Sequence, residues 1–186
     1  MTTAGVGPTP RRPGPPDGTP SVFIADEQSE YDVDIAGLVT LAQEVLRAEG
    51  VRGDCELAIT FVDETTIAEL NKEFLGEDGP TDVLAFPIDD EVVESGRSPD
   101  SGTTGPDRPD VEPGEVPVLL GDVMVCPTVA ARNAAERDRS TDDEVALLVV
   151  HGILHVLGMD HADPDEEATM FAKQDDLLQR FHKPRT

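Results

Sequence analysis

Apolar positions along the chain fall into short segments of two kinds, which predict strands and helices in turn. Short runs rich in β-branched residues predict strands, whereas apolar residues three and four positions apart predict helices with one buried face. On this basis strands are expected at 22–25, 57–62, 83–86 and 118–126, and helices at 34–48, 65–75, 128–139, 145–157 and from 163 onward. The fourth strand is expected to be interrupted at Gly121 and Asp122. This order favours a single α+β domain, in which helices cover a mixed β-sheet.

Two segments break the pattern and are predicted to lie outside the packed domain. Residues 1–20 contain six prolines and four glycines, and such a tail buries too little apolar surface to offset the entropy lost on ordering. Residues 95–116 contain four prolines and four glycines, which predicts a long acidic loop between two strands. The folded domain is therefore expected to span residues 21–183.

The helix expected at 145–157 differs from the others because it is apolar almost all round. A helix of this kind is buried on most of its sides. Thr141 and Glu144 form a capping-box pattern before it, and Gly158 suits the left-handed position that ends a helix. The pattern therefore predicts a buried central helix.

The balance of charges changes the range of functions to consider. The chain has 39 acidic and 14 basic side chains, with a formal net charge of −25. A nucleic-acid-binding protein usually carries a basic surface that neutralises phosphates, so this composition argues against a generic one. Arg132, Arg137 and Arg139 form at most a small positive strip, and an ordinary solvated helix surface is the favoured interpretation. A salt-rich cytoplasm would screen so acidic a surface, which is a hypothesis about origin.

The chain shows no pattern of a membrane or secreted protein. No apolar run reaches the roughly 20 residues of a membrane span, and no charged-then-apolar leader opens the sequence. Cys55 and Cys126 form neither a C-x-x-C pair nor a disulfide framework, and Cys126 is interpreted as a small buried residue. A cytoplasmic protein without a membrane partner is expected.

Three of the four histidines lie within residues 151–161. His151 and His155 are one helical turn apart and share a face, and Gly158 allows the chain to reverse so that His161 returns to the same point. Three imidazoles with one open position are the arrangement of a catalytic zinc site, in which the pKa of a bound water falls towards ~7. We therefore expect one zinc ion per chain. Because imidazole also binds nickel, copper and iron, another metal stays open.

The residues near the histidines limit the reactions that a metal site here could catalyse. Asp160 is a candidate to orient a histidine or to act as a base, although capping of the turn is an equally favoured role. His182, the fourth histidine, is expected to be solvated. The spacing of the three histidines is also that of metzincin proteases, in which a glutamate after the first histidine is the general base. Gly152 stands there and cannot accept a proton, which disfavours a metalloprotease.

Residues 151–161, HGILHVLGMDH, resemble the H-G-x-L-H-x-x-G-x-D-H signature of the YbeY endoribonucleases, or rRNA maturation factors. Residues 81–87, TDVLAFP, are similar to the family's T-D-V-L-S-F-P segment, and residues 120–127, LGDVMVCP, to its L-G-D-I-x-I-C/S-P strand. Leu70 and Asn71 begin a segment similar to the family's L-N-x-x-[YF]-R. The resemblance covers about residues 22–181, in the family's order.

The resemblance implies a zincin-like domain with a metal site at the end of the central helix, where His151, His155 and His161 bind the metal. It further implies a zinc-dependent, single-strand-specific endoribonuclease that acts in late 16S rRNA 3′-end maturation and ribosome quality control. The partners would be single-stranded RNA, the 16S rRNA precursor and the small ribosomal subunit. Ribosomal proteins or an assembly GTPase are further candidates.

Two positions depart from the family pattern. Leu75 stands where the family has an arginine after the aromatic residue, and Ala85 replaces the usual serine. Together with the long acidic loop, these two changes make the chain similar to an actinobacterial-type subgroup of the family. Because the arginine is thought to contact RNA or assist catalysis, Leu75 keeps an alternative open, a small-subunit assembly factor whose zinc is mainly structural. A metalloprotease remains the less favoured alternative.

Overall fold

The computed structural model describes residues 19–88, 117–159 and 163–183. In these ranges the elements are β1 (Ser21–Asp26), α1 (Ile35–Ala48), β2 (Cys55–Phe61), α2 (Glu64–Leu75), β3 (Val83–Pro87), β4 (Val118–Val125), α4 (Pro127–Glu136), α5 (Thr141–Val156) and α6 (Pro164–Phe181). They match the strands and helices predicted from the hydrophobic pattern, with small shifts of the bounds. The predicted acidic loop at 95–116 and most of the predicted tail lie outside the described residues. Pro20, which the sequence pattern assigns to the tail, is buried.

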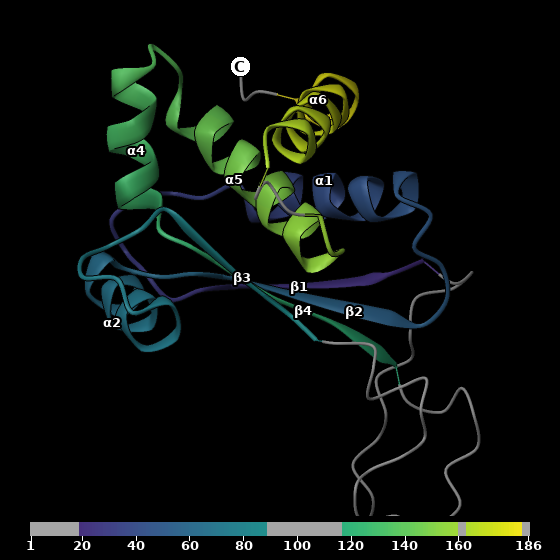
Figure 1. The fold of residues 1–186 in the computed structure, drawn as a ribbon, viewed down its shortest axis with the longest axis horizontal. Helices are drawn as coiled ribbons and strands as arrows, with labels where there is room; N and C mark the ends of the chain where they lie inside the picture. Colours follow the sequence, from purple (N-terminus) through teal and green to yellow (C-terminus); the bar gives the residue numbers. More distant parts are fainter. Residues whose placement is uncertain (1–18, 89–116, 160–162, 184–186) are drawn as a thin grey trace, which may run out of the picture.

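The four strands form one mixed sheet in the order β1-β2-β4-β3. Strand β2 runs parallel to both β1 and β4, whereas β3 is antiparallel to β4 at the edge of the sheet. Helices α1 and α5 cover one face, with α6 packed outside them, and α2 lies on the opposite side (Figure 1). The predicted α+β class with a mixed sheet and packed helices is confirmed.

Strand β2 shows how the hydrophobic pattern fixes this arrangement. Its buried residues are Cys55, Leu57, Ile59 and Phe61, and each alternates with a partly exposed residue. Because successive side chains of a strand point to opposite faces, the four buried residues share one face of the sheet. Leu57, Ile59 and Phe61 belong to the main hydrophobic core, together with residues of α1, α5 and α6.

Helix α5 is the buried central helix that the sequence predicts, but it begins differently. Its N-cap is Ser140, whose Oγ accepts a hydrogen bond from the backbone N–H of Asp143 at 3.1 Å. The predicted capping box from Thr141 to Glu144 is wrong, because the fully buried Glu144 carboxylate turns to arginines outside the helix. At the other end Gly158 has a φ of +85°, as predicted for the residue that closes the helix.

Strand β4 is continuous, so the predicted interruption at Gly121 and Asp122 is wrong. Instead Leu119 pairs with Glu56 and Gly121 with Leu57, which leaves Leu120 as the extra residue of a β-bulge. Gly121 has a φ of +152°, and a Cβ atom there would lie 2.4 Å from the carbonyl oxygen of Phe86. The glycine therefore permits close approach of the edge strand.

Candidate metal centre

Helix α5 carries His151 and His155 on the side that faces α6. Both are half-buried, whereas the residues between them are buried against the core. The two rings meet nearly edge to face, with centroids 4.7 Å apart and an interplanar angle of 77°. Their Nε2 atoms lie 3.1 Å apart. The predicted helical spacing thus brings the two imidazoles together.

This distance fits joint binding of a single metal ion. Two Zn–N bonds of about 2.0–2.1 Å at a tetrahedral angle would place the nitrogens about 3.3 Å apart. The observed separation of 3.1 Å is close to that value. The separation of the two nitrogens therefore fits a shared ion, and in the protein without metal it also fits an Nε2–H···Nε2 hydrogen bond between the two rings.

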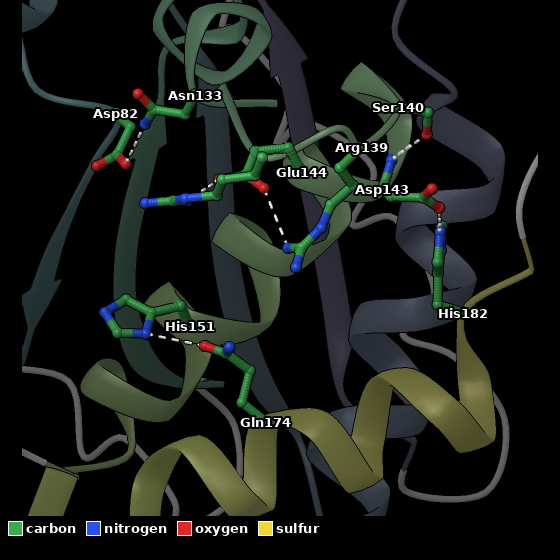
Figure 2. Close-up of polar contacts among 10 residues, drawn as sticks. Asp82, Asn133, Arg139, Ser140, Asp143, Glu144, His151, Gln174 and His182 are labelled. Atoms are coloured by element: carbon green, nitrogen blue, oxygen red, sulfur yellow. Dashed lines mark hydrogen bonds and ion pairs between the residues drawn. The ribbon is translucent and has the colours of Figure 1, made fainter. Parts of the chain in front are cut away.

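A third polar group, which the sequence pattern did not indicate, contacts His151. Nδ1 of His151 lies 3.0 Å from Oε1 of Gln174 on α6, and the two side chains point toward each other (Figure 2). The ring of Phe171 flanks His151 at a centroid distance of 6.2 Å. A signal for Gln174 existed, since it lies between Met170 and Leu177 on the apolar face of the last helix.

The third predicted ligand, His161, and the neighbouring Asp160 lie outside the described residues. Within the described ranges, no group of three metal-ligating side chains is assembled. The structure therefore places two of the three predicted ligands, and the complete three-histidine site stays a prediction.

Gly152 explains how α5 reaches the sheet and why a carboxylate is absent after the first histidine. A Cβ atom at this position would lie 2.5 Å from Cγ1 of Val123 on β4 and 3.4 Å from Cγ2 of Val83 on β3. The helix therefore lies directly on the two strands, with no room for a glutamate side chain. This packing disfavours the metzincin mechanism more strongly than the missing side chain alone.

The prediction that His182 is solvated is wrong. Its side chain is only 18% exposed, and its Nε2 lies 2.7 Å from Oδ1 of Asp143 at the start of α5 (Figure 2). Two hydrogen bonds lower the pKa of Asp143 below its ordinary value, a larger contribution from Ser140 and a smaller one from His182. His182 therefore joins the C-terminal end of α6 to the N-terminal end of α5.

The arginines considered as a positive strip are paired with carboxylates instead. Arg132 forms an ion pair with Glu64 on α2, and Arg137 and Arg139 both pair with Glu144. The three arginines share two carboxylates, so part of their positive charge is offset within the protein. The less favoured interpretation, a basic surface strip, finds no support.

Cys126 is fully buried, as predicted, and burial raises the pKa of its thiol. Cys55 is also buried, and both cysteines are free thiols. Among the described residues, no helix is both long enough and apolar enough to cross a membrane.

A cavity of about 460 Å³ lies at the N-terminal end of α5, and its lining includes His182 but neither His151 nor His155. Its walls include Tyr31, Leu41, Thr141 and Phe181. Thr141 precedes His151 by ten residues, which is about 15 Å along a helix. A second hollow of about 390 Å³ adjoins the turn after α5, where Asp163, Asp165 and Glu166 contribute to its lining. This second hollow is therefore lined in part by acidic residues.

A mixed sheet covered by helices, with a histidine pair on its buried central helix, defines an α+β protein with a candidate metal centre. The model of the family "Endoribonuclease YbeY" matches residues 23–182. The chain therefore belongs to the YbeY endoribonuclease family, an enzyme family that hydrolyses RNA phosphodiester bonds. The resemblance inferred from the sequence motifs is confirmed.

Similar proteins include actinobacterial members, as the sequence indicates. The chain is 43% identical to an endoribonuclease YbeY of Salinispora tropica over 166 residues, which are 89% of this chain and 99% of that protein. It is 43% identical to the Mycobacterium tuberculosis protein of the same name, over 87% of this chain and 83% of that one. The solution structure of TM1509 from Thermotoga maritima is 29% identical, with a TM-score of 0.51 over 85% of this chain and 87% of that one.

Proposed function

We propose that this protein is a zinc-dependent endoribonuclease specific for single-stranded RNA, with a zincin-like fold and His151, His155 and His161 as the zinc ligands. Its role is late 16S rRNA 3′-end maturation and ribosome quality control in the cytoplasm. The observation that carries the proposal is the facing pair of Nε2 atoms, 3.1 Å apart, in a chain of the YbeY endoribonuclease family.

The roles of the protein's own residues follow from their positions. Bound zinc would supply a Lewis acid that stabilises the charge developing on phosphoryl oxygens. His151 and His155 hold the metal on a helix whose position is fixed by the contact of Gly152 with Val123. Asp160, next to the third ligand in sequence, is the proposed group to orient a histidine or to accept a proton.

The negative charge of the protein limits its affinity for RNA. A chain with a net charge of −25 repels a phosphate backbone at low salt, and Arg132, Arg137 and Arg139 already contact carboxylates of the chain. We therefore expect weak affinity for free RNA and recognition within a larger complex. The proposed partners are single-stranded RNA, the 16S rRNA precursor and the small ribosomal subunit, with ribosomal proteins or an assembly GTPase assisting.

One observation favours a second candidate, a small-subunit assembly factor with a mainly structural zinc. Leu75 ends α2 with 64% of its surface exposed, and an apolar side chain cannot neutralise a phosphate. Substitution Leu75→Arg restores a cation at this position. A rise in RNA cleavage by this variant would assign the position to substrate contact, whereas unchanged cleavage and binding would remove the argument from Leu75.

The test of the proposed function is cleavage of single-stranded RNA from the 16S 3′ region by the purified protein. We expect slow cleavage that is lost in His151→Ala, no cleavage of casein, and unprocessed 16S 3′ ends in cells that lack the protein. Copurification with small-subunit precursors without any cleavage would favour the assembly factor. Casein cleavage that vanishes in His151→Ala would favour the protease, and normal rRNA ends in the deletion strain would contradict both ribosomal roles.

A further inference from the structure

Gln174 is a polar residue on the buried face of α6. It is only 6% exposed, and its neighbours on that face, Met170 and Leu177, are almost completely buried. A buried amide requires a hydrogen-bond partner, since an unmet polar group in the core is costly. Its Oε1 meets Nδ1 of His151 at 3.0 Å (Figure 2). The buried amide of Gln174 thus points to His151, one member of the histidine pair.

The chemistry of this contact defines the state of the imidazole. An amide oxygen can only accept a hydrogen bond, so Nδ1 of His151 must carry the proton. In the neutral ring the lone pair then lies on Nε2, because the two ring nitrogens share one proton. That Nε2 is the atom that faces Nε2 of His155 at 3.1 Å.

We propose that Gln174 is the positioning residue of the metal centre: it holds His151 in the Nδ1–H tautomer and directs its Nε2 lone pair to the metal position shared with His155. The role in metal binding rests on the proposed function, whereas the role in setting the tautomer does not. Because the amide is neutral, it orients the ring without placing a charge in this buried position.

The packing of α6 around Gln174 supplies a matched control. The adjacent Lys173 pairs through Nζ with Oε2 of Glu49, just after α1, at 2.7 Å. This ion pair fastens α6 to the domain but does not involve either histidine. Lys173→Gln therefore weakens the docking of α6 and leaves the contact of Gln174 with His151 in place.

The first test reads the tautomer of His151 in the metal-free protein. Two-bond ¹H–¹⁵N NMR correlations are recorded for the wild type, Gln174→Met, Gln174→Glu and Lys173→Gln, at a pH where the imidazole is neutral. Methionine keeps a similar volume in the buried position without the amide oxygen, so the variant should fold. We expect the Nδ1–H tautomer in the wild type, Gln174→Glu and Lys173→Gln, and a shift to Nε2–H in Gln174→Met.

The second test measures zinc affinity by competition with a chromophoric chelator. Loss of a partner that orients a metal-bound histidine typically weakens metal binding by about 10–100-fold, which we expect for Gln174→Met. Gln174→Glu restores an acceptor and should bind zinc about as tightly as the wild type, as should Lys173→Gln. A structural role alone would instead lower the melting temperature of the metal-free Gln174→Met protein without changing its zinc affinity.

The outcomes separate the two proposals. Zinc that is lost in His151→Ala but held equally well by Gln174→Met and the wild type would overturn only the positioning role. An Nε2–H tautomer in the wild type, or a Lys173→Gln effect as large as that of Gln174→Met, would also overturn it. Zinc retained by His151→Ala would contradict the proposed metal centre, while the NMR result would still decide whether Gln174 sets the tautomer.

Discussion

The two ends of helix α5 bury polar side chains in opposite ways. At the N-terminal end the fully buried carboxylate of Glu144 is matched by two opposite charges, Arg137 and Arg139. At the C-terminal end His151 and His155 present chemically identical nitrogens to each other at 3.1 Å. The first arrangement joins opposite charges within the chain, whereas the second brings together two ring nitrogens, which are a ligand type of metal ions.

This difference separates a structural cluster from a functional one. Opposite charges that meet inside a protein neutralise each other, and their removal is felt as lost stability. Like ligand atoms held side by side add little stability to the fold, but they bind an ion from outside. The comparison therefore predicts that substitutions at one end of α5 change stability and that substitutions at the other end change metal content.

The largest effect is expected at the C-terminal end. His155→Ala should lower zinc affinity by at least about 100-fold, because two ligands hold the metal much less firmly than three. Metal analysis of the purified protein measures this loss, with His182→Ala as the control that keeps its zinc. Equal zinc in both variants would mean that the histidine pair is not the metal site.

The next effect belongs to the N-terminal end. Glu144→Gln should lower the free energy of unfolding by about 2 kcal/mol, because the pair is buried on one side while both arginines still reach water. Denaturant unfolding of the metal-free protein measures the change, and the exposed Glu136→Gln on α4 serves as the control. The zinc content of Glu144→Gln should stay unchanged. A loss of zinc in this variant would contradict the assignment of a structural role to the N-terminal end of α5 and of metal binding to its C-terminal end.

A smaller effect is expected for the contact of Asp143 with His182. The pKa of Asp143 is lowered in the folded protein. Its ionised carboxylate therefore stabilises the fold at pH values above 3.8, the ordinary pKa of the group. That contribution is lost as the pH falls through the lower folded value. Asp143→Asn should therefore destabilise the protein at pH 7 and have less effect at strongly acidic pH.

Unfolding curves at the two pH values test the contact of Asp143. His182→Ala should lower stability at pH 7 by roughly 0.5–1 kcal/mol, as is usual for a partly exposed pair. An Asp143→Asn effect that grows on acidification would contradict the assigned direction of the pKa shift.

The smallest effect is expected for the N-terminal segment that the sequence pattern assigns to a tail. Removal of residues 1–18 should leave the melting temperature and the zinc content unchanged, because this Pro/Gly-rich segment lacks an apolar pattern. Removal through Pro20, which is buried, should lower the melting temperature slightly. A large loss of either property in the shorter deletion would show that the tail is part of the domain.

The hydrophobic pattern was sufficient to predict the elements and the histidine pair. Periodicity is a local property, so strand β2, the buried helix α5 and the shared face of His151 and His155 follow from residues within a few positions of one another. The third histidine, His161, was predicted from its position after Gly158 and again from the family signature, and it lies outside the described part of the chain. These predictions needed no knowledge of how distant segments pack.

The partners of polar residues could not be predicted in the same way. Gln174 is 23 positions from His151, and His182 is 39 from Asp143, so each contact exists only because α6 packs against α5. The predicted capping box failed for a different, local reason. Ser140 caps the helix in place of Thr141, and Glu144 pairs with arginines just before the helix. These alternatives lie within a few residues of one another, and the sequence pattern did not distinguish them.

The central claim, a zinc centre on α5 that cleaves RNA, is tested most directly by zinc titration of the metal-free protein. The rate of cleavage of single-stranded RNA from the 16S 3′ region is measured as zinc is added to chelator-treated wild type and to His151→Ala. We expect no cleavage without metal, recovery that is complete at about one zinc per chain, and no recovery in His151→Ala. Cleavage that persists without metal, or that zinc restores equally in His151→Ala, would contradict the central claim.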